Sequence, residues 1–127
     1  MAETRRILLV EDNELNRALV RAIVTRAAEP WIRTAELVEA HTLAQARAVI
    51  GSMPVDIVLL DVQLPDGSGL SLVDDIDRTV NGPRPRVIAV TGGVMPEQRA
   101  AAAAVGCDAI VTKPYVAADL VRALNGP

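Results

Sequence analysis

Four short apolar stretches of this chain each run directly into polar residues, and the types of these residues suit a shared chemistry. In chain order they are Glu11, Asp12, Asp61, Thr91 and Lys113. Ligands of an open parallel sheet bind outside the carboxyl ends of its strands. If the four stretches are parallel strands, three carboxylates, a hydroxyl and an ammonium group converge on one edge. Such a set suits a divalent cation together with a phosphoryl group.

The adjacent carboxylates Glu11 and Asp12 have two interpretations. Without a counter-charge two packed carboxylates repel each other, and a bound hard cation such as Mg²⁺ removes that repulsion. The alternative is a solvated acidic turn that opens a helix, where Asp is a favoured capping residue. The pair alone leaves both open.

Asp61 follows the third expected strand and could act as a nucleophile that forms an acyl phosphate. Such a reaction needs in-line positioning and neutralisation of the phosphoryl oxygens. Mg²⁺ held by Asp12 and Asp61 would supply positive charge, and Lys113 would supply more. The Thr91 hydroxyl could donate a hydrogen bond to a phosphoryl oxygen. Each residue has an ordinary explanation by itself, but four coincidences at four strand ends are improbable.

The composition predicts one α/β domain that covers residues 1–127. Half of the residues are hydrophobic, but the chain has no Phe, one Trp and one Tyr. The core must therefore be built from Ala, Val, Leu and Ile, as in the near-continuous apolar strands of a parallel sheet.

Charge and cysteine content argue against several classes of protein. The net charge is −3 and no basic cluster is present, so direct nucleic-acid binding is not expected. The single cysteine, Cys107, cannot form an internal disulfide bond, which favours a cytoplasmic protein. The first residues lack the apolar segment of a signal peptide. No apolar stretch approaches the ~20 residues of a membrane span, so no direct membrane contact is expected.

Apolar periodicity and turn residues predict five strand–helix units. The predicted strands are 7–10, 33–38, 55–60, 86–90 and 109–112. The apolar stripes of the predicted helices lie within 13–28, 43–50, 70–80, 96–104 and 117–124. We expect Pro30 to stop the first helix and Gly51 to cap the second. This alternation predicts a parallel sheet with helices on both faces.

The chain resembles a receiver domain of bacterial two-component signalling over essentially its whole length. The residues that carry the resemblance are Glu11, Asp12, Asp61, Pro65, Gly69, Thr91, Lys113 and Pro114. The resemblance implies a flavodoxin-like single domain, a doubly wound five-stranded parallel sheet with strand order 2-1-3-4-5, the order this fold is known for. Segment 10–17 looks especially like receivers of hybrid histidine kinases and phosphorelays.

The resemblance also implies a function and a role for each site residue. A histidine kinase or histidine phosphotransfer protein would transfer a phosphoryl group to Asp61, in a switch that catalyses only its own phosphorylation and dephosphorylation. Mg²⁺ would be bound by Asp12 and Asp61, by Glu11 through water and by the Gln63 backbone carbonyl. Thr91, Gly92 and Lys113 would bind the phosphoryl group. The expected output surface is 96–124, and the expected docking residues for the donor are Leu15, Arg17, Pro114 and Tyr115.

The chain departs from the receiver pattern at two places. Ile110 stands where receivers often have an aromatic residue, and it cannot report the position of the Thr91 hydroxyl by a change of rotamer as an aromatic ring does. Gly92 and Gly93 follow Thr91 and relax the backbone there, and Gly93 has no side chain to shield an attacking water. His41 is expected to be an ordinary polar residue after the second strand.

Two other functions stay open on the sequence. One is an interaction module with a receiver fold that works without phosphorylation. The other is a phosphohydrolase with an aspartyl nucleophile, in which Gln63 would stand at the position of the usual acidic proton donor. Whether the chain is a separate protein or part of a larger regulator also stays open.

Overall fold

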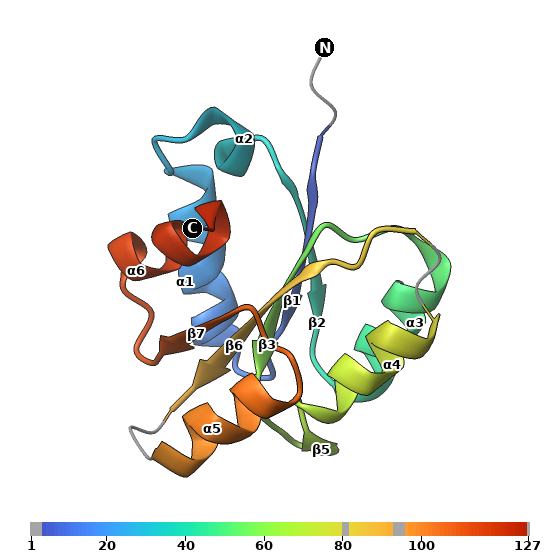
Figure 1. The fold of residues 1–127 in the computed structure, drawn as a ribbon. Coiled ribbons are helices and arrows are strands. Elements are labelled where there is room, and N and C mark those ends of the chain that lie inside the picture. The colour runs from blue at the N-terminus through green and yellow to red at the C-terminus, as the bar shows by residue number, and fades with distance from the viewer. Residues whose placement is uncertain (1–3, 80–81, 93–95, 127) are drawn as a thin grey trace.

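A computed structural model describes residues 4–79, 82–92 and 96–126. Five parallel strands form its main sheet, in the order β2–β1–β3–β6–β7 (Figure 1). Their bounds are β1 (Arg6–Val10), β2 (Glu36–Ala40), β3 (Ile57–Asp61), β6 (Arg86–Thr91) and β7 (Ala109–Thr112). Counted along the chain, this is the predicted order 2-1-3-4-5, so the predicted fold class is confirmed.

Helices cover both faces of the sheet, as predicted. Figure 1 shows α1 (Glu14–Thr25) and α6 (Ala117–Asn125) on one side, with α3 (Leu43–Ser52) and α4 (Ser71–Thr79) on the other. Each face of the sheet has its own hydrophobic core, and alternate residues of β1 pack into each. Ile7 and Leu9 belong to one cluster, and Leu8 and Val10 belong to the other. Every residue of β3 is buried, which explains why its sequence is a continuous apolar run.

Two predicted boundaries near the first helix were wrong. The helix α1 begins after Asn13, whose side chain accepts a hydrogen bond from the Asn16 backbone N–H, but it ends at Thr25. Pro30 does not stop it. Pro30 instead begins the short helix α2 (Pro30–Arg33), where a missing N–H costs no hydrogen bond. Because α2 occupies these residues, β2 begins at Glu36 rather than at residue 33.

Other boundaries shifted by a few residues. Gly51 lies inside α3 and the capping residue is Met53, so the predicted glycine cap was wrong. A short hairpin of β4 (Gln63–Leu64) and β5 (Gly67–Ser68) was not predicted. Of α5 (Pro96–Ala104) only Ala102 is buried, which fits the small apolar bulk of this helix. The predicted end of the third long helix at 80–81 lies outside the described residues.

The sole tryptophan packs against the core cluster that includes residues of α1 and α6. Trp31 lies in α2, and its indole N–H donates a 2.9 Å hydrogen bond to Asn125 Oδ1. The Arg5 guanidinium lies over its ring, 4.5 Å from the centroid. His41 directly follows β2, where its backbone N–H donates to the Gln45 side chain.

Candidate functional site

The polar residues that follow the strands come together at one edge of the sheet. Lys113 Nζ lies 3.0 Å from Glu11 Oε1 and 3.0 Å from Asp61 Oδ2. These residues follow β7, follow β1 and end β3, so the ion pairs join segments far apart in the chain. Parallel strands bring them together because their carboxyl ends meet on one side.

Three carboxylates form a compact acidic group. One oxygen from each of Glu11, Asp12 and Asp61 lies within 4.8 Å of the others. Glu11 and Asp61 are buried, while Asp12 is exposed. Hard cations prefer such oxygen donors, and an exposed ligand leaves room for water on the cation. The residues present therefore fit a divalent cation such as Mg²⁺.

Burial perturbs the acid–base properties of this group. Burial, together with the nearby charge of Glu11, raises the pKa of Asp61 to about 6. The hydrogen bonds from Lys113 and the Gln63 N–H lower this pKa but do not outweigh burial. Burial also opposes charge on Glu11, but hydrogen bonds from Lys113 and the Asn13 N–H outweigh it and lower its pKa. Contact with both carboxylates raises the pKa of Lys113 despite its burial. Of the two buried carboxylates, Asp61 thus has the less compensated charge.

A cavity of about 420 Å³ opens beside these groups. Its lining residues are Asp12, Asn13, Asn16, Asp61, Gln63, Leu64, Pro65, Gly92 and Lys113. The backbone N–H of Gln63 donates a 3.0 Å hydrogen bond to Asp61 Oδ1, so both Asp61 oxygens have protein donors. Thr91 is buried at the end of β6, and its carbonyl accepts a 2.7 Å hydrogen bond from the Lys113 N–H. Gly93 lies outside the described residues.

A family model described as the response regulator receiver domain matches residues 7–125. The chain is a member of the receiver-domain family. Receiver domains are phosphoryl-accepting signalling switches, and this is the function class of the chain. The predicted family resemblance is therefore confirmed.

Named relatives and solved structures agree with this assignment. The polar-differentiation response regulator DivK of Brucella ovis is 33% identical over 111 residues, which cover 87% of this chain and 85% of DivK. DivK of Brucella anthropi is 35% identical, covering 85% of this chain and 83% of the relative.

Among solved structures, the receiver domain of sensor histidine kinase PA1611 from Pseudomonas aeruginosa PAO1 has a TM-score of 0.81 and 27% identity. The match covers 97% of this chain and 96% of that one, and magnesium is coordinated in that protein's active site cleft. A CheY-like receiver domain protein from Methanospirillum hungatei JF-1 has a TM-score of 0.80 and 26% identity, covering 97% and 92% of the two chains.

The receiver structure explains why a glycine stands at position 69. A Cβ added to Gly69 would lie 2.0 Å from the carbonyl oxygen of Asp61, far inside van der Waals contact. Its N–H also donates a 2.7 Å hydrogen bond to the Val62 carbonyl. The loop after Asp61 therefore folds back onto the end of β3, which a side chain at this position would prevent.

Two expected docking residues of this receiver are buried instead. Tyr115 is 6% exposed and its hydroxyl donates a 3.3 Å hydrogen bond to Glu11 Oε1. Arg17 is also 6% exposed and its guanidinium faces the backbone of Glu11. Both support the acidic group from within the protein, so their assignment to a docking surface was wrong. Leu15, by contrast, is 80% exposed and Pro114 is exposed, so both are available at the surface.

Among the helices described here, none has the length and apolar character to cross a membrane.

Proposed function

We propose that this receiver accepts its phosphoryl group on Asp61, from a phosphohistidine of a histidine kinase or histidine phosphotransfer protein, with Mg²⁺ as cofactor. The observation that supports this most directly is the position of Lys113 Nζ, 3.0 Å from both Asp61 Oδ2 and Glu11 Oε1. It places a cation beside Asp61, the buried carboxylate whose pKa is raised, at the wall of the cavity.

The transfer exchanges one bond to phosphorus for another. A carboxylate oxygen of Asp61 forms a bond to phosphorus while the phosphorus–nitrogen bond of the donor breaks, and the electron pair leaves with the imidazole. With a pKa of about 6, Asp61 is mostly ionised at neutral pH and can act as the nucleophile. Lys113 stabilises the charge that remains on the phosphoryl oxygens.

The other site residues bind the cofactor and the phosphoryl group. Asp12 and Asp61 would ligate Mg²⁺ directly, Glu11 through water, and Gln63 through its backbone carbonyl. Bound there, Mg²⁺ would add positive charge next to the phosphoryl oxygens. Thr91 and Gly92, at the end of β6, are the proposed hydrogen-bond donors to the same oxygens.

The signal is a change in partner binding, because the phosphoryl group biases an equilibrium between two arrangements of the domain. The receiver then turns over no separate substrate. A phosphohydrolase would need a proton donor near Asp61, and the Gln63 amide is a poor one. The single-domain extent 1–127, the downstream partner and a cytoplasmic location stay predictions.

Intact-mass measurement after incubation with Mg²⁺ and acetyl phosphate tests the proposal. We expect one phosphoryl group on the wild type and none on Asp61→Asn, with no uptake when EDTA removes the cation. Equal uptake by both proteins would contradict the role of Asp61. A wild type that accepts no phosphoryl group from acetyl phosphate or from a phosphorylated histidine phosphotransfer protein would favour the phosphorylation-independent interaction module.

A further inference from the structure

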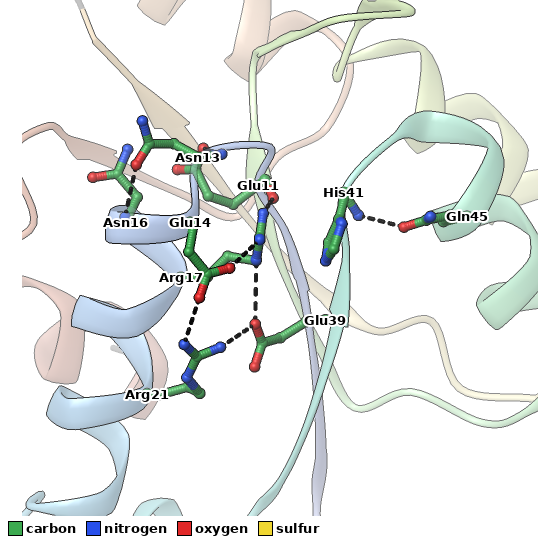
Figure 2. A network of polar contacts seen from close by, with 9 residues as sticks. All are labelled: Glu11, Asn13, Glu14, Asn16, Arg17, Arg21, Glu39, His41 and Gln45. Atoms are coloured by element: carbon green, nitrogen blue, oxygen red, sulfur yellow. Dashed lines mark hydrogen bonds and ion pairs between the residues drawn. The ribbon is translucent and has the colours of Figure 1, made fainter.

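A buried arginine lies directly beneath the acidic turn, and the proposed phosphoryl transfer assigns it no role. Figure 2 shows Arg17 at the centre of a polar network between α1 and the ends of β1 and β2. Its NH1 group donates a 3.0 Å hydrogen bond to the carbonyl oxygen of Glu11. Its NH2 group pairs with Glu14, and its Nε lies 3.4 Å from Glu39 Oε1. Only 7% of the side chain is exposed.

The planar guanidinium connects three elements in a way that a lysine ammonium cannot reproduce. It reaches from α1 to the end of β1 through the Glu11 carbonyl, and to β2 through Glu39. Arginine offers five donors in a fixed fork, whereas lysine is a point charge on a flexible stem. Burying an unpaired charge is expensive, so the two glutamates stabilise the buried position of Arg17.

Arg21 is a natural internal comparison for Arg17. It lies one turn further along α1 and pairs with the same acids, Glu39 at 2.6 Å and Glu14 at 3.1 Å. Its side chain is 42% exposed, and its ion pairs and hydrogen bonds are with Glu14 and Glu39. The two arginines thus share their ion-pair partners, but of the two only Arg17 donates to the main chain of the acidic turn.

The main chain at Glu11 is held on both sides. Its N–H donates a 3.0 Å hydrogen bond to the Ala40 carbonyl at the end of β2, and its carbonyl accepts the bond from Arg17. The Glu11 carbonyl belongs to the peptide group that joins Glu11 to Asp12. Its orientation therefore decides where both carboxylates of the pair point relative to Asp61.

We propose that Arg17 is a positioning residue for the cation site. Its guanidinium fixes the peptide group between Glu11 and Asp12, and so keeps both carboxylates close to the carboxylate of Asp61. This inference rests on the proposed binding of Mg²⁺ at these three residues. Arg17 itself touches neither the cation nor the phosphoryl group in this scheme.

If Arg17 acted only through its charge, its replacement would change the Mg²⁺ affinity in the opposite direction. A positive charge near a cation site repels the cation, so removal of that charge should strengthen Mg²⁺ binding. A positioning role predicts weaker binding when Arg17 is replaced, because the carboxylates lose their arrangement. The sign of the change in Mg²⁺ affinity therefore separates the two roles.

The test is a Mg²⁺ titration followed by amide chemical shifts in two-dimensional NMR spectra. The proteins are the wild type, Arg17→Lys, Arg17→Met and the matched control Arg21→Met. We expect both Arg17 variants to bind Mg²⁺ about tenfold more weakly, which is typical when a group that orients a metal ligand is lost. Arg21→Met should bind Mg²⁺ as well as the wild type or more tightly. The spectra also show whether each variant is folded. If Arg17→Met does not fold, Arg17→Lys, which retains the positive charge, still tests the proposal.

Each outcome decides between the roles. Arg17→Lys that binds Mg²⁺ as tightly as the wild type would overturn the positioning role and leave the proposed function intact. An equal loss of affinity in Arg21→Met would also overturn it, because the loss would then come from the shared ion pairs. A wild type that binds no Mg²⁺ would overturn this inference together with the proposed cofactor.

Discussion

Replacement of Asp61 by asparagine should stabilise the folded protein when no divalent cation is present. The Asp61 carboxyl is 4% exposed, and its burial near Glu11 raises its pKa from 3.8 to about 6. A shift of about two pKa units corresponds to about 3 kcal/mol of unfavourable free energy for the ionised group in the folded state. The neutral amide avoids this cost but loses part of the interaction with Lys113. We therefore expect a gain of about 1–3 kcal/mol at pH 7.

The pH dependence of this gain follows from the direction of the pKa shift. Below pH 3.8 the Asp61 carboxyl is protonated in both the folded and the unfolded state, so its ionisation does not affect the free energy of unfolding. Between pH 3.8 and about 6 the unfolded chain loses the proton first, and the wild type loses stability relative to Asp61→Asn. Above about pH 6 the difference in the free energy of unfolding between the wild type and Asp61→Asn should be constant. Mg²⁺ should stabilise the wild type more than Asp61→Asn, since the variant lacks one of the proposed carboxylate ligands.

The assay is urea unfolding in EDTA at pH 5, 6 and 7.5, followed by a titration with Mg²⁺. Asp74→Asn is the matched control, because Asp74 is an exposed carboxylate on α4 and its loss should change the free energy of unfolding by less than about 0.5 kcal/mol. An Asp61→Asn protein that is no more stable than the wild type at pH 7.5 in EDTA would refute the reasoning that burial of this charge opposes folding.

Four further predictions concern single substitutions. Gly69→Ala should destabilise the fold by about 1–3 kcal/mol, because its Cβ would lie 2.0 Å from the Asp61 carbonyl oxygen. Gly51→Ala, in the last turn of α3 with open space around it, should instead stabilise the fold by at most about 0.5–1 kcal/mol in the same urea assay. Asp66→Ala should cost about 1 kcal/mol, since both Asp66 oxygens accept backbone hydrogen bonds from the first turn of α3, and an unchanged urea midpoint would contradict this. Lys113→Met should raise the pKa of Asp61 further in an NMR titration, because it removes the ammonium group 3.0 Å from that carboxylate, and a lower pKa would contradict the assigned ion pair.

Local chemistry along the chain was enough to predict the parallel sheet and the convergence of Glu11, Asp61 and Lys113 at its edge. A strand buried on both faces must be apolar at every position, so β3 is visible as a run of Ile, Val and Leu that ends in Asp61. The rule that parallel strands point their carboxyl ends to one edge then places Lys113 near Asp61, although 52 residues separate them.

The short elements could not be predicted in the same way. The helix α2 and the hairpin of β4 and β5 are too short to have a periodic pattern. Glu29, Pro30 and Trp31 read as a loop along the chain, but Trp31 gains contacts with Arg5 and Asn125 that only the folded chain provides. The start of β2 shifted for this reason.

The fold class and the polar residues that meet at the sheet edge follow from the pattern of the chain, and the strand order follows from its family resemblance. How those residues are supported depends on the folded protein. Arg17 and Tyr115 are polar residues next to expected surface segments, and nothing in their local sequence shows that they are buried. Their burial depends on Glu39 of β2 and on Glu11 at the end of β1, which approach them only when the chain is folded. Strand pattern is a local property of the chain, whereas the burial of a charge depends on what distant segments place around it.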